Sequence, residues 1–417
     1  MFKKTRLIAT SYLPAQYKEI AKHFSYLFAL RVAQQLIGFV SFFFIVHYVP
    51  KEIIGHYQFV LSVIALVSIT SLPGMRGALM QSVARKRGGF FKTATRYSVI
   101  GAVAGSLILL IIAGYHFVIN DLMMAIAFAV AALLNPLGQG LLTWKSSYSG
   151  EERFKALAVI DAMSSLITSA FLMISALFYN ESHILLLCIA LIIPAIQNFI
   201  FWGIEFRKYK ASSVGEDGMK EYGLKTSAYQ IFPTVAGQID RISIYNFMSA
   251  SDLAAYSVAM KIPEALKSVI QNLGDVLMPK FAKLPKFTPK MDKTMGMFSL
   301  LSLVVIIGFA FTVFPLIFKF LVPSEYESSI YYVQALLCTV AIGNHAILRS
   351  KYIKSQKDAE NFKRLVTMNS IIRVVSMPVF IFFLGIWGAV AAIFIQRIIT
   401  SIFTEYLIIK YYKMSNS

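Results

Sequence analysis

The chain has 417 residues, of which 57% are hydrophobic and only 15% are charged, and its mean hydropathy is +0.65. Soluble domains carry about 25% charged residues, so the composition excludes a soluble protein and indicates a polytopic membrane protein. The formal net charge of +19 is typical of nucleic-acid binding. However, the basic residues lie between apolar runs, where they orient a membrane protein, and we expect no nucleic-acid partner.

Twelve runs are long and apolar enough to cross a bilayer, which takes about 20 residues each. They predict an all-α polytopic membrane protein with about 12 transmembrane helices. The runs cover residues 24–46, 56–80, 97–118, 122–144, 156–179, 183–204, 225–247, 253–278, 297–319, 328–349, 364–384 and 387–409.

The basic residues alternate strongly between the two sides of these runs. The termini and the loops after even-numbered runs hold 31 Lys and Arg, whereas the other side holds only Lys51 and Lys319. Positive loops stay in the cytoplasm, so both termini are expected there. Because the first run has no small-residue cleavage site, we expect an uncleaved first span.

A weak internal repeat divides the chain into two halves. Residues 49–57 (VPKEIIGHY) align with 248–256 (MSASDLAAY), and 150–160 (GEERFKALAVI) align with 358–368 (DAENFKRLVTM). Two pseudo-symmetric six-helix bundles follow from this repeat. The predicted domains are a cytoplasmic segment 1–23, a bundle 24–204, a cytoplasmic linker 205–224, a bundle 225–409 and a cytoplasmic tail 410–417.

Charged residues inside the predicted spans are the strongest functional signal. Such residues cost at least roughly 2.5–3.5 kcal/mol at the bilayer centre and usually face a wet cavity. Seven are basic, and four acids lie at comparable depth, so the excess indicates an anion pathway. The basic residues are Arg31, Arg76, Arg241, Lys261, Lys267, Arg373 and Arg397, and the acids are Asp161, Asp240, Glu264 and Asp275.

The eighth run carries the longest polar face. At 100° per residue, Lys261, Glu264, Lys267, Gln271 and Asp275 fall on one side of the helix. Glu264 lies three residues from both lysines and is expected to pair with them. The alternative is a buried ion-pair ladder that only packs helices, but so long a face favours a cavity wall.

Shorter polar faces occur on other runs. Arg241 is adjacent to Asp240 and is expected to form either a local pair or part of the cavity wall. The candidate substrate-binding residues are Arg31, Gln34, Gln35, Arg76, Gln230, Asp240, Arg241, Lys261, Lys267, Gln271, Asn369 and Arg373, and the candidate ion-coupling residues are Glu264, Asp275 and Asp161.

Several absences restrict the function further. The chain has no phosphate-binding G-x-x-x-x-G-K-[ST] motif, and its six histidines show no metal spacing, so neither a cofactor nor a metal is expected. Cys188 and Cys338 both lie in apolar runs. The predicted outer loops are too short for the active site of a polymerase or glycosyltransferase. We therefore expect a transporter and not an enzyme.

The twelve runs, basic loops and cationic interior resemble the polysaccharide (Wzx-type) flippases of the MOP exporter superfamily. The local similarity lies in VPKEIIGHYQFVLSVIALV, in QIDRISIYNFMSASDLAAYSVAMKI and in LMPKF (277–281). The resemblance implies a flippase of the bacterial inner membrane that moves an undecaprenyl-pyrophosphate-linked oligosaccharide (an O-antigen or capsule repeat unit) outward by ion-coupled alternating access. Its implied partners are membrane lipids, a polysaccharide polymerase and the chain-length machinery.

Within that hypothesis, Lys267, Arg31 and Arg373 hold the head group, and Glu264 or Asp275 exchanges a coupling proton. A multidrug or cation antiporter of the same superfamily is one alternative, but it favours a net acidic cavity. A carrier of a soluble anion is a second alternative. A membrane-embedded transferase is a third, disfavoured by the short outer loops.

Overall fold

The structure, a computed structural model, describes residues 15–209, 218–282, 287–356 and 359–416. Within these ranges, the described side chains exclude residues 15–29, 31, 273, 275–280, 282, 359 and 411–416. The predicted site residues Arg31 and Asp275 therefore lie outside the described side chains, and residues 210–217 of the predicted linker lie outside the described chain. Throughout the described ranges the regular structure is helical, without strands, which confirms the predicted fold class.

The N-terminal half contains the first six predicted spans. Two of them are interrupted helices, because α3 continues into α4 and α6 continues into α7 after short distorted turns. Its helices are α2 (Ala15–Tyr48), α3 (Lys51–Val67), α4 (Pro73–Ala84), α5 (Phe90–Val118), α6 (Leu122–Asn135), α7 (Thr143–Gly150), α8 (Phe154–Phe178) and α9 (His183–Tyr209).

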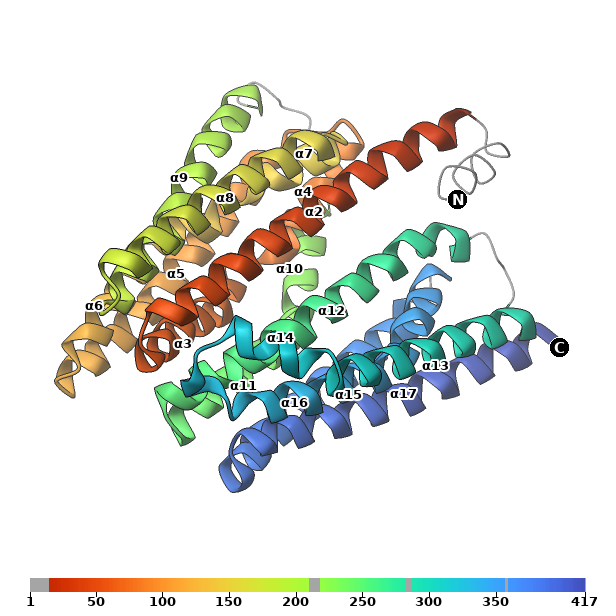
Figure 1. Cartoon of the computed structure of the whole chain (residues 1–417). Coiled ribbons are helices and arrows are strands. Elements are labelled where there is room, and N and C mark those ends of the chain that lie inside the picture. Colours follow the sequence, from red (N-terminus) through yellow and green to blue (C-terminus); the bar gives the residue numbers. More distant parts are fainter. Residues whose placement is uncertain (1–14, 210–217, 283–286, 357–358, 417) are drawn as a thin grey trace.

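The C-terminal half contains the other six spans. Figure 1 shows it in green to blue beside the red-to-yellow-green N-terminal half, with both termini at the same end of the molecule. Its helices are α10 (Met219–Tyr229), α11 (Ile231–Phe247), α12 (Ala250–Ala282), α13 (Pro289–Phe311), α14 (Phe314–Leu321), α15 (Ser329–Ser355), α16 (Ala359–Leu384) and α17 (Ile386–Asn416).

Nine helical segments in the described part of the chain are long and apolar enough to cross a membrane. The three other predicted spans correspond to α2, to α10 with α11, and to α12. Each departs from an ordinary apolar span for a physical reason. The described apolar part of α2 is short, the seventh span is broken at Gln230, and α12 carries several charges on one face.

The break in the second span has a local cause. Leu72 adopts a left-handed backbone conformation with φ 54°, and Pro73 follows as the first residue of α4. A proline lacks the N–H that would continue the preceding helix, and Leu rarely adopts positive φ without support from its surroundings. The sequence predicted one uninterrupted span over 56–80, whereas the structure has α3 and α4 with a turn between them.

The two halves meet at the end of the molecule opposite the termini, which we call the neutral end because its turns carry few charges. There α3 packs against α11 and α12. Phe59 stacks on Tyr245 with ring centroids 3.7 Å apart, and His56 Nδ1 lies 2.9 Å from the Tyr245 hydroxyl. Gly55 lies directly against the backbone of Ala250. The halves are therefore tightly joined at the neutral end.

A second contact between the halves lies nearer the other end, which we call the basic end because its loops hold most of the Lys and Arg. There α10 packs against α4 of the N-terminal half, and Figure 1 shows α10 lying between the two halves. The Gly74 backbone N–H donates to Ser227 Oγ over 2.9 Å, and Gln81 Nε2 donates to the Tyr222 hydroxyl. The seventh span thus contacts both halves.

The Gly55 contact yields a testable prediction. A Cβ at this position would lie 1.9 Å from the Ala250 carbonyl oxygen, so Gly55→Ala forces α3 and α12 apart. We expect it to lower the free energy of unfolding by about 1–3 kcal/mol, the usual cost of overpacking. Thermal unfolding of the purified chain, followed by tryptophan fluorescence, measures the effect.

Gly114→Ala is the matched control, because nothing lies within 4 Å of a Cβ at Gly114 in α5. Alanine is favoured over glycine inside a helix, so this variant should be neutral or slightly stabilising. Equal melting temperatures for the two variants would contradict the close approach of α3 and α12.

Candidate functional site

A buried carboxylate lies at the centre of the C-terminal half. Asp240 of α11 is 2% exposed and accepts hydrogen bonds from Arg373 Nη2 of α16 and from the Tyr256 hydroxyl of α12, each over 2.7 Å. The expected local pair of Asp240 with Arg241 is wrong, since the carboxylate turns to α16 instead. Arg373 is thus already neutralised by an acid, and this contact joins three helices.

Arg241 pairs with the next helix. Its Nη2 lies 3.1 Å from Glu264 Oε1 of α12. No ion pair of Glu264 with Lys261 or Lys267 is present among the described contacts, although the charge of Glu264 attracts both lysines. Glu264 remains 45% exposed in this pair, so it lies beside an open space and not in the packed core.

Four cations at membrane depth remain without an acid partner in the described part of the chain. They are Arg76, Lys261, Lys267 and Arg397. Lys261 lies over the Phe42 ring of α2, with 4.4 Å to the centroid, and Arg397 lies against Gly343 of α15. Arg397 Nε is buried without a hydrogen-bond partner. Because unpaired buried charges are costly, this group favours an anion as its missing partner.

Lys267 lies closest to the centre of this cationic group. It is within electrostatic range of both Arg397 and Arg373, and Asp240 and Glu264 provide only partial compensation because each already pairs with an arginine. Arg397 was recognised from the sequence as a buried charge but was omitted from the candidate site. The packing of α17 against α15 brings Arg397 toward Lys267.

Predicted amide residues line a small polar pocket between α2 and α12. Gln34, Gln35, Ser268 and Asn272 surround a volume of about 280 Å³, and Gln35 Nε2 donates to Ser268 Oγ. Lys267 precedes Ser268 in α12 but does not line this pocket. Gln271 is exposed on the same helix.

Two other predicted polar residues have different roles. Gln230 lies at the junction of α10 and α11, where its carbonyl accepts a hydrogen bond from Thr234 Oγ1. Arg76 lies in α4, after the break in the second span, and it is half-buried. The structure therefore groups Lys261, Lys267 and the α2 amides, while Arg76 and Gln230 lie on other elements.

The N-terminal half has its own polar pocket. Asp161 of α8 accepts hydrogen bonds from Lys145 Nζ (2.8 Å) and Gln197 Nε2 (3.1 Å). Asp161 was a predicted ion-coupling residue, but its pairing with Lys145 was not foreseen. The pocket has a volume of about 310 Å³ and is lined by Lys145, Asp161, Ser164, Ser165, Thr168, Ser169, Pro194 and Gln197.

The C-terminal half repeats this contact. Asn369 Oδ1 of α16 accepts hydrogen bonds from Gln396 Nε2 (2.7 Å) and Thr400 Oγ1 (2.9 Å) of α17. Asn369 aligns with Asp161 in the sequence repeat, and Gln396 and Gln197 each lie on the sixth span of their half. The equivalent polar contacts support the pseudo-symmetry of the two halves.

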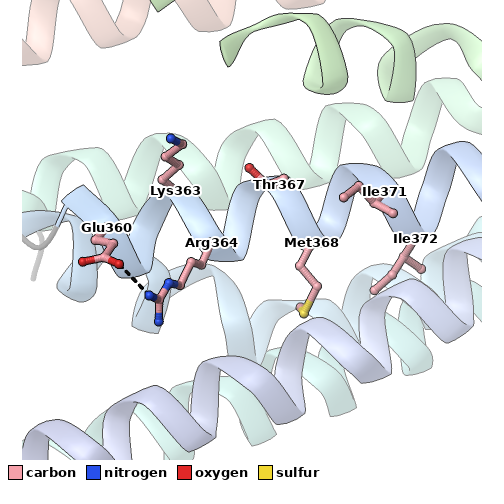
Figure 2. A pocket seen from close by; sticks show the side chains of 7 residues that line it. All are labelled: Glu360, Lys363, Arg364, Thr367, Met368, Ile371 and Ile372. Carbon is pink, nitrogen blue, oxygen red and sulfur yellow. Dashed lines mark hydrogen bonds and ion pairs between the residues drawn. The ribbon is translucent and has the colours of Figure 1, made fainter.

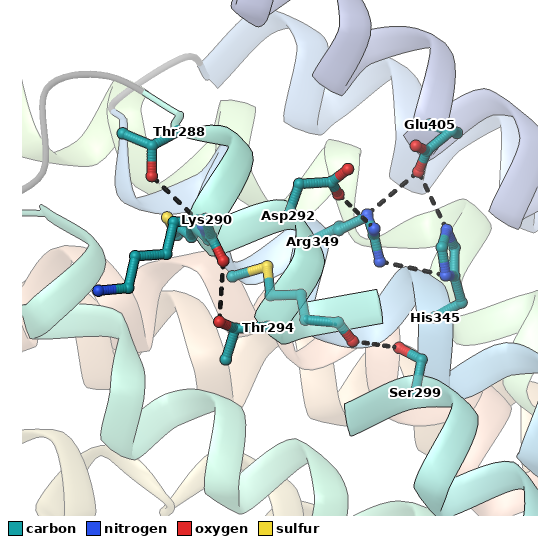
Figure 3. Close-up of polar contacts among 10 residues, drawn as sticks. Thr288, Lys290, Asp292, Thr294, Ser299, His345, Arg349 and Glu405 are labelled. Carbon is teal, nitrogen blue, oxygen red and sulfur yellow. Dashed lines mark hydrogen bonds and ion pairs between the residues drawn. The ribbon is translucent and has the colours of Figure 1, made fainter. Parts of the chain in front are cut away.

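A cluster of ionisable residues that the sequence analysis missed joins α13, α15 and α17 at the basic end (Figure 3). Arg349 Nη2 lies 2.5 Å from Asp292 Oδ1, and Arg349 Nε lies 3.1 Å from Glu405 Oε2. His345 Nε2 lies 3.0 Å from the same Glu405 oxygen, and His345 Nδ1 lies 3.1 Å from Arg349 Nη1. We call these four residues the histidine cluster.

Two signals in the sequence point to the histidine cluster. Glu405 falls inside the predicted span 387–409, and His345 and Arg349 are four residues apart in helical sequence. Their meeting depends on the packing of α15 against α13 and α17.

A shallow pocket of about 520 Å³ lies on the outer face of α16 (Figure 2). Arg364 pairs there with Glu360 over 2.5 Å, and both side chains are mostly exposed. Lys363 lies 3.7 Å from the centre of the Tyr229 ring of α10. This pocket occupies the opposite side of α16 from Arg373 and is separate from the cationic group.

The Asp240–Arg373 contact yields a testable prediction. Arg373→Ala leaves a buried carboxylate without its arginine, which typically costs about 3–5 kcal/mol. We expect a large drop in thermal stability, and Asp240→Asn in the same chain should recover much of it. Arg364→Ala is the control, because that exposed pair contributes about 0–1 kcal/mol. Equal effects of Arg373→Ala and Arg364→Ala would contradict a structural role for the buried pair.

Solved structures with the same fold are transporters and flippases. The lipid II flippase MurJ in an inward closed conformation matches with a TM-score of 0.64 at 13% identity, covering 92% of this chain and 89% of MurJ. An inward-facing multidrug resistance MATE family transporter of the MOP superfamily matches with a TM-score of 0.61 at 11% identity, covering 92% and 96%. The eukaryotic MATE transporter AtDTX14 matches with a TM-score of 0.57 at 14% identity, covering 96% and 98%.

The sequence of the chain also matches the profile of a protein family. The profile described as "Polysaccharide biosynthesis protein" covers residues 49–331, more than half of the chain. No individual curated protein matches the chain in sequence. The chain therefore belongs to this polysaccharide biosynthesis family and is an integral membrane protein with the fold of the MOP-superfamily flippases and transporters.

Proposed function

We propose that the chain is a flippase that moves an undecaprenyl-pyrophosphate-linked oligosaccharide, such as an O-antigen or capsule repeat unit, from the cytoplasmic to the periplasmic leaflet. One observation carries the proposal. Arg76, Lys261, Lys267 and Arg397 lie at membrane depth without acid partners in the described part of the chain. An anionic substrate is the partner that this arrangement lacks.

The pyrophosphate suits this group chemically. It carries about two negative charges, and its attraction to Lys and Arg strengthens where water is excluded. Lys267 and Arg397 are the primary candidates for the contact. Arg373, predicted to hold the head group, is held by Asp240 and instead contributes positive potential nearby.

The sugar units need hydrogen-bonding walls. Gln34 and Gln35 of α2 with Ser268 and Asn272 of α12 form such a wall. Asn369 contributes less, because its carbonyl oxygen already accepts two hydrogen bonds within the C-terminal half. The family description as polysaccharide biosynthesis proteins supports a glycan as part of the substrate.

Transport proceeds in this proposal by alternating access of two bundles, 24–204 and 225–409, joined by the linker 205–224. The tight contact at the neutral end closes that side in the present structure. Positive loops stay in the cytoplasm, so the basic end and both termini lie on the cytoplasmic side of a bacterial inner membrane. The lipid tail stays in the bilayer through an opening between the halves.

An ion gradient drives the cycle in this proposal. Glu264 is the more accessible of the two described candidate carboxylates, because its pair with Arg241 is partly exposed. Asp161 is engaged by Lys145 and Gln197 and is better suited to linking helices. The chain acts as a transporter without catalysing a chemical step, and it supplies lipid-linked units to a polymerase and its chain-length machinery.

The observations favour this function over a cation antiporter. A cationic substrate requires acids that are free to pair with it, whereas Asp240 and Glu264 are both occupied by arginines. A soluble anion would suit the same cations, so an experiment must separate the lipid-linked substrate from a soluble one.

Removal of the central cation provides the test. We expect Lys267→Ala to reduce transport at least about tenfold, because a lost charge-assisted contact in a dry site costs about 1.5–3 kcal/mol. Lys267→Arg should retain most activity. Mass spectrometry of lipid-linked intermediates in cells lacking the native chain measures the result, with accumulation of an undecaprenyl-pyrophosphate oligosaccharide reporting loss of flipping.

Lys290→Ala is the control, because Lys290 is exposed at the start of α13, away from the cationic group. Normal transport by a stably inserted Lys267→Ala variant would refute the proposed anion contact. If loss of the chain causes no lipid-linked intermediate to accumulate, the substrate is a different anion.

A further inference from the structure

We propose that His345 is a proton-binding site, and that its protonation releases Arg349 and rearranges the contacts among α13, α15 and α17. The existence of this site is independent of the substrate. Its use as the coupling site of transport rests on the proposed flippase function.

The hydrogen bonds define the protonation state of His345 in the present structure. A guanidinium is only a donor, so Arg349 Nη1, 3.1 Å from His345 Nδ1, requires Nδ1 to be an acceptor. This geometry suits a neutral His345 that carries its hydrogen on Nε2. That hydrogen is donated to Glu405 Oε2 over 3.0 Å. The arrangement thus represents the proton-free state of the site.

The charge of the cluster favours a proton. With neutral His345, the single positive charge of Arg349 faces the two carboxylates Asp292 and Glu405, and the cluster carries one net negative charge. A proton on His345 makes the cluster neutral. The buried Arg349 is shared by two carboxylates, so one carboxylate charge lacks a full counter-charge, which a proton on His345 supplies.

Within the cluster, His345 and Glu405 are partly exposed, whereas Arg349 is buried. The side chains of His345 and Glu405 are 35% and 36% exposed, so protons can reach them, whereas Arg349 is only 3% exposed. Histidine is the side chain that ordinarily changes charge between about pH 5 and 8. The proton-accepting group is thus accessible, and the group that responds to it is buried.

The other charged residues of the helices around His345 do not contact it among the described contacts. From α13, Lys290 and Lys293 are exposed, and from α16, Arg373 is held by Asp240. On the deeper turns, Lys267 of α12 and Arg397 of α17 belong to the cationic group, and Arg397 lies against Gly343 near His345.

Protonation has a defined structural consequence. A hydrogen on Nδ1 faces the Arg349 N–H, so the contact between His345 and Arg349 changes from attraction to repulsion. His345 then holds Glu405 as an ion pair, and Arg349 shifts toward Asp292. Because these residues come from three helices, one proton changes how α17 is tied to α13 and α15.

The experiment compares His345→Gln with the unmodified full-length chain in lipid nanodiscs. A glutamine amide supplies one donor and one acceptor, as neutral histidine does, but cannot take up a proton in this range. NMR of labelled histidine rings between about pH 5 and 8 should show one titrating signal that the variant loses. In the unmodified chain at high pH, that signal should report the Nε2–H tautomer.

A distance measurement tests the structural response without any substrate. Spin labels at Met297→Cys of α13 and Tyr406→Cys of α17, both exposed, are placed in a chain with Cys188→Ser and Cys338→Ser. We expect the distance distribution to change with pH through the His345 titration. In His345→Gln it should stay in its high-pH form throughout.

His47→Gln is the matched control, because His47 contacts only the Phe43 carbonyl of its own helix. Glu405→Gln is a second variant, expected to shift the His345 titration to lower pH because it removes the charge that favours the proton. A signal of His345 that does not titrate, or a distance change that persists in His345→Gln, would overturn the proposal. Since neither measurement involves a substrate, that failure is distinguishable from a failure of the flippase function.

Discussion

The cost of holding charge at membrane depth constrains the organisation of this protein more than any other interaction. Each acid that the described structure places there is matched to a base on another helix, as in Asp240–Arg373 and Arg241–Glu264. These pairs tie α11 to α12 and α16. The remaining bases at this depth have no acid partner in the described part of the chain, and in the proposed function they serve the anionic substrate.

The interrupted helices allow segments of one half to pack on the other half. A continuous second span would carry α4 along the axis of α3, but the turn at Leu72 lets α4 pack on α10 of the other half. The seventh span is divided at Gln230, so that α11 packs on α16 while α10 reaches α4. The halves are therefore joined by helix segments that can reorient about short turns, which suits an exchange between two arrangements.

The two halves share equivalent polar contacts between their fifth and sixth spans, but the charges at these contacts differ. In both halves the fifth span binds a glutamine of the sixth, through Asp161 and Gln197 or through Asn369 and Gln396. The aspartate of the N-terminal half is compensated by Lys145, whereas the asparagine of the C-terminal half needs no counter-charge. The unpaired cations and the histidine cluster lie mainly in the C-terminal half. The two bundles thus share a scaffold and differ in electrostatic function.

Hydropathy and charge placement, read from the sequence alone, determined the membrane character, the helical fold, the approximate spans and the excess of buried basic residues. These properties depend on the transfer of local segments into a bilayer, so they can be read from local composition. The partners of the charges were decided only by the tertiary structure. Arg373 of α16 pairs with Asp240 of α11, and Arg349 of α15 pairs with Asp292 of α13 and Glu405 of α17. These contacts depend on how the helices pack and not on the spacing of the residues in the chain.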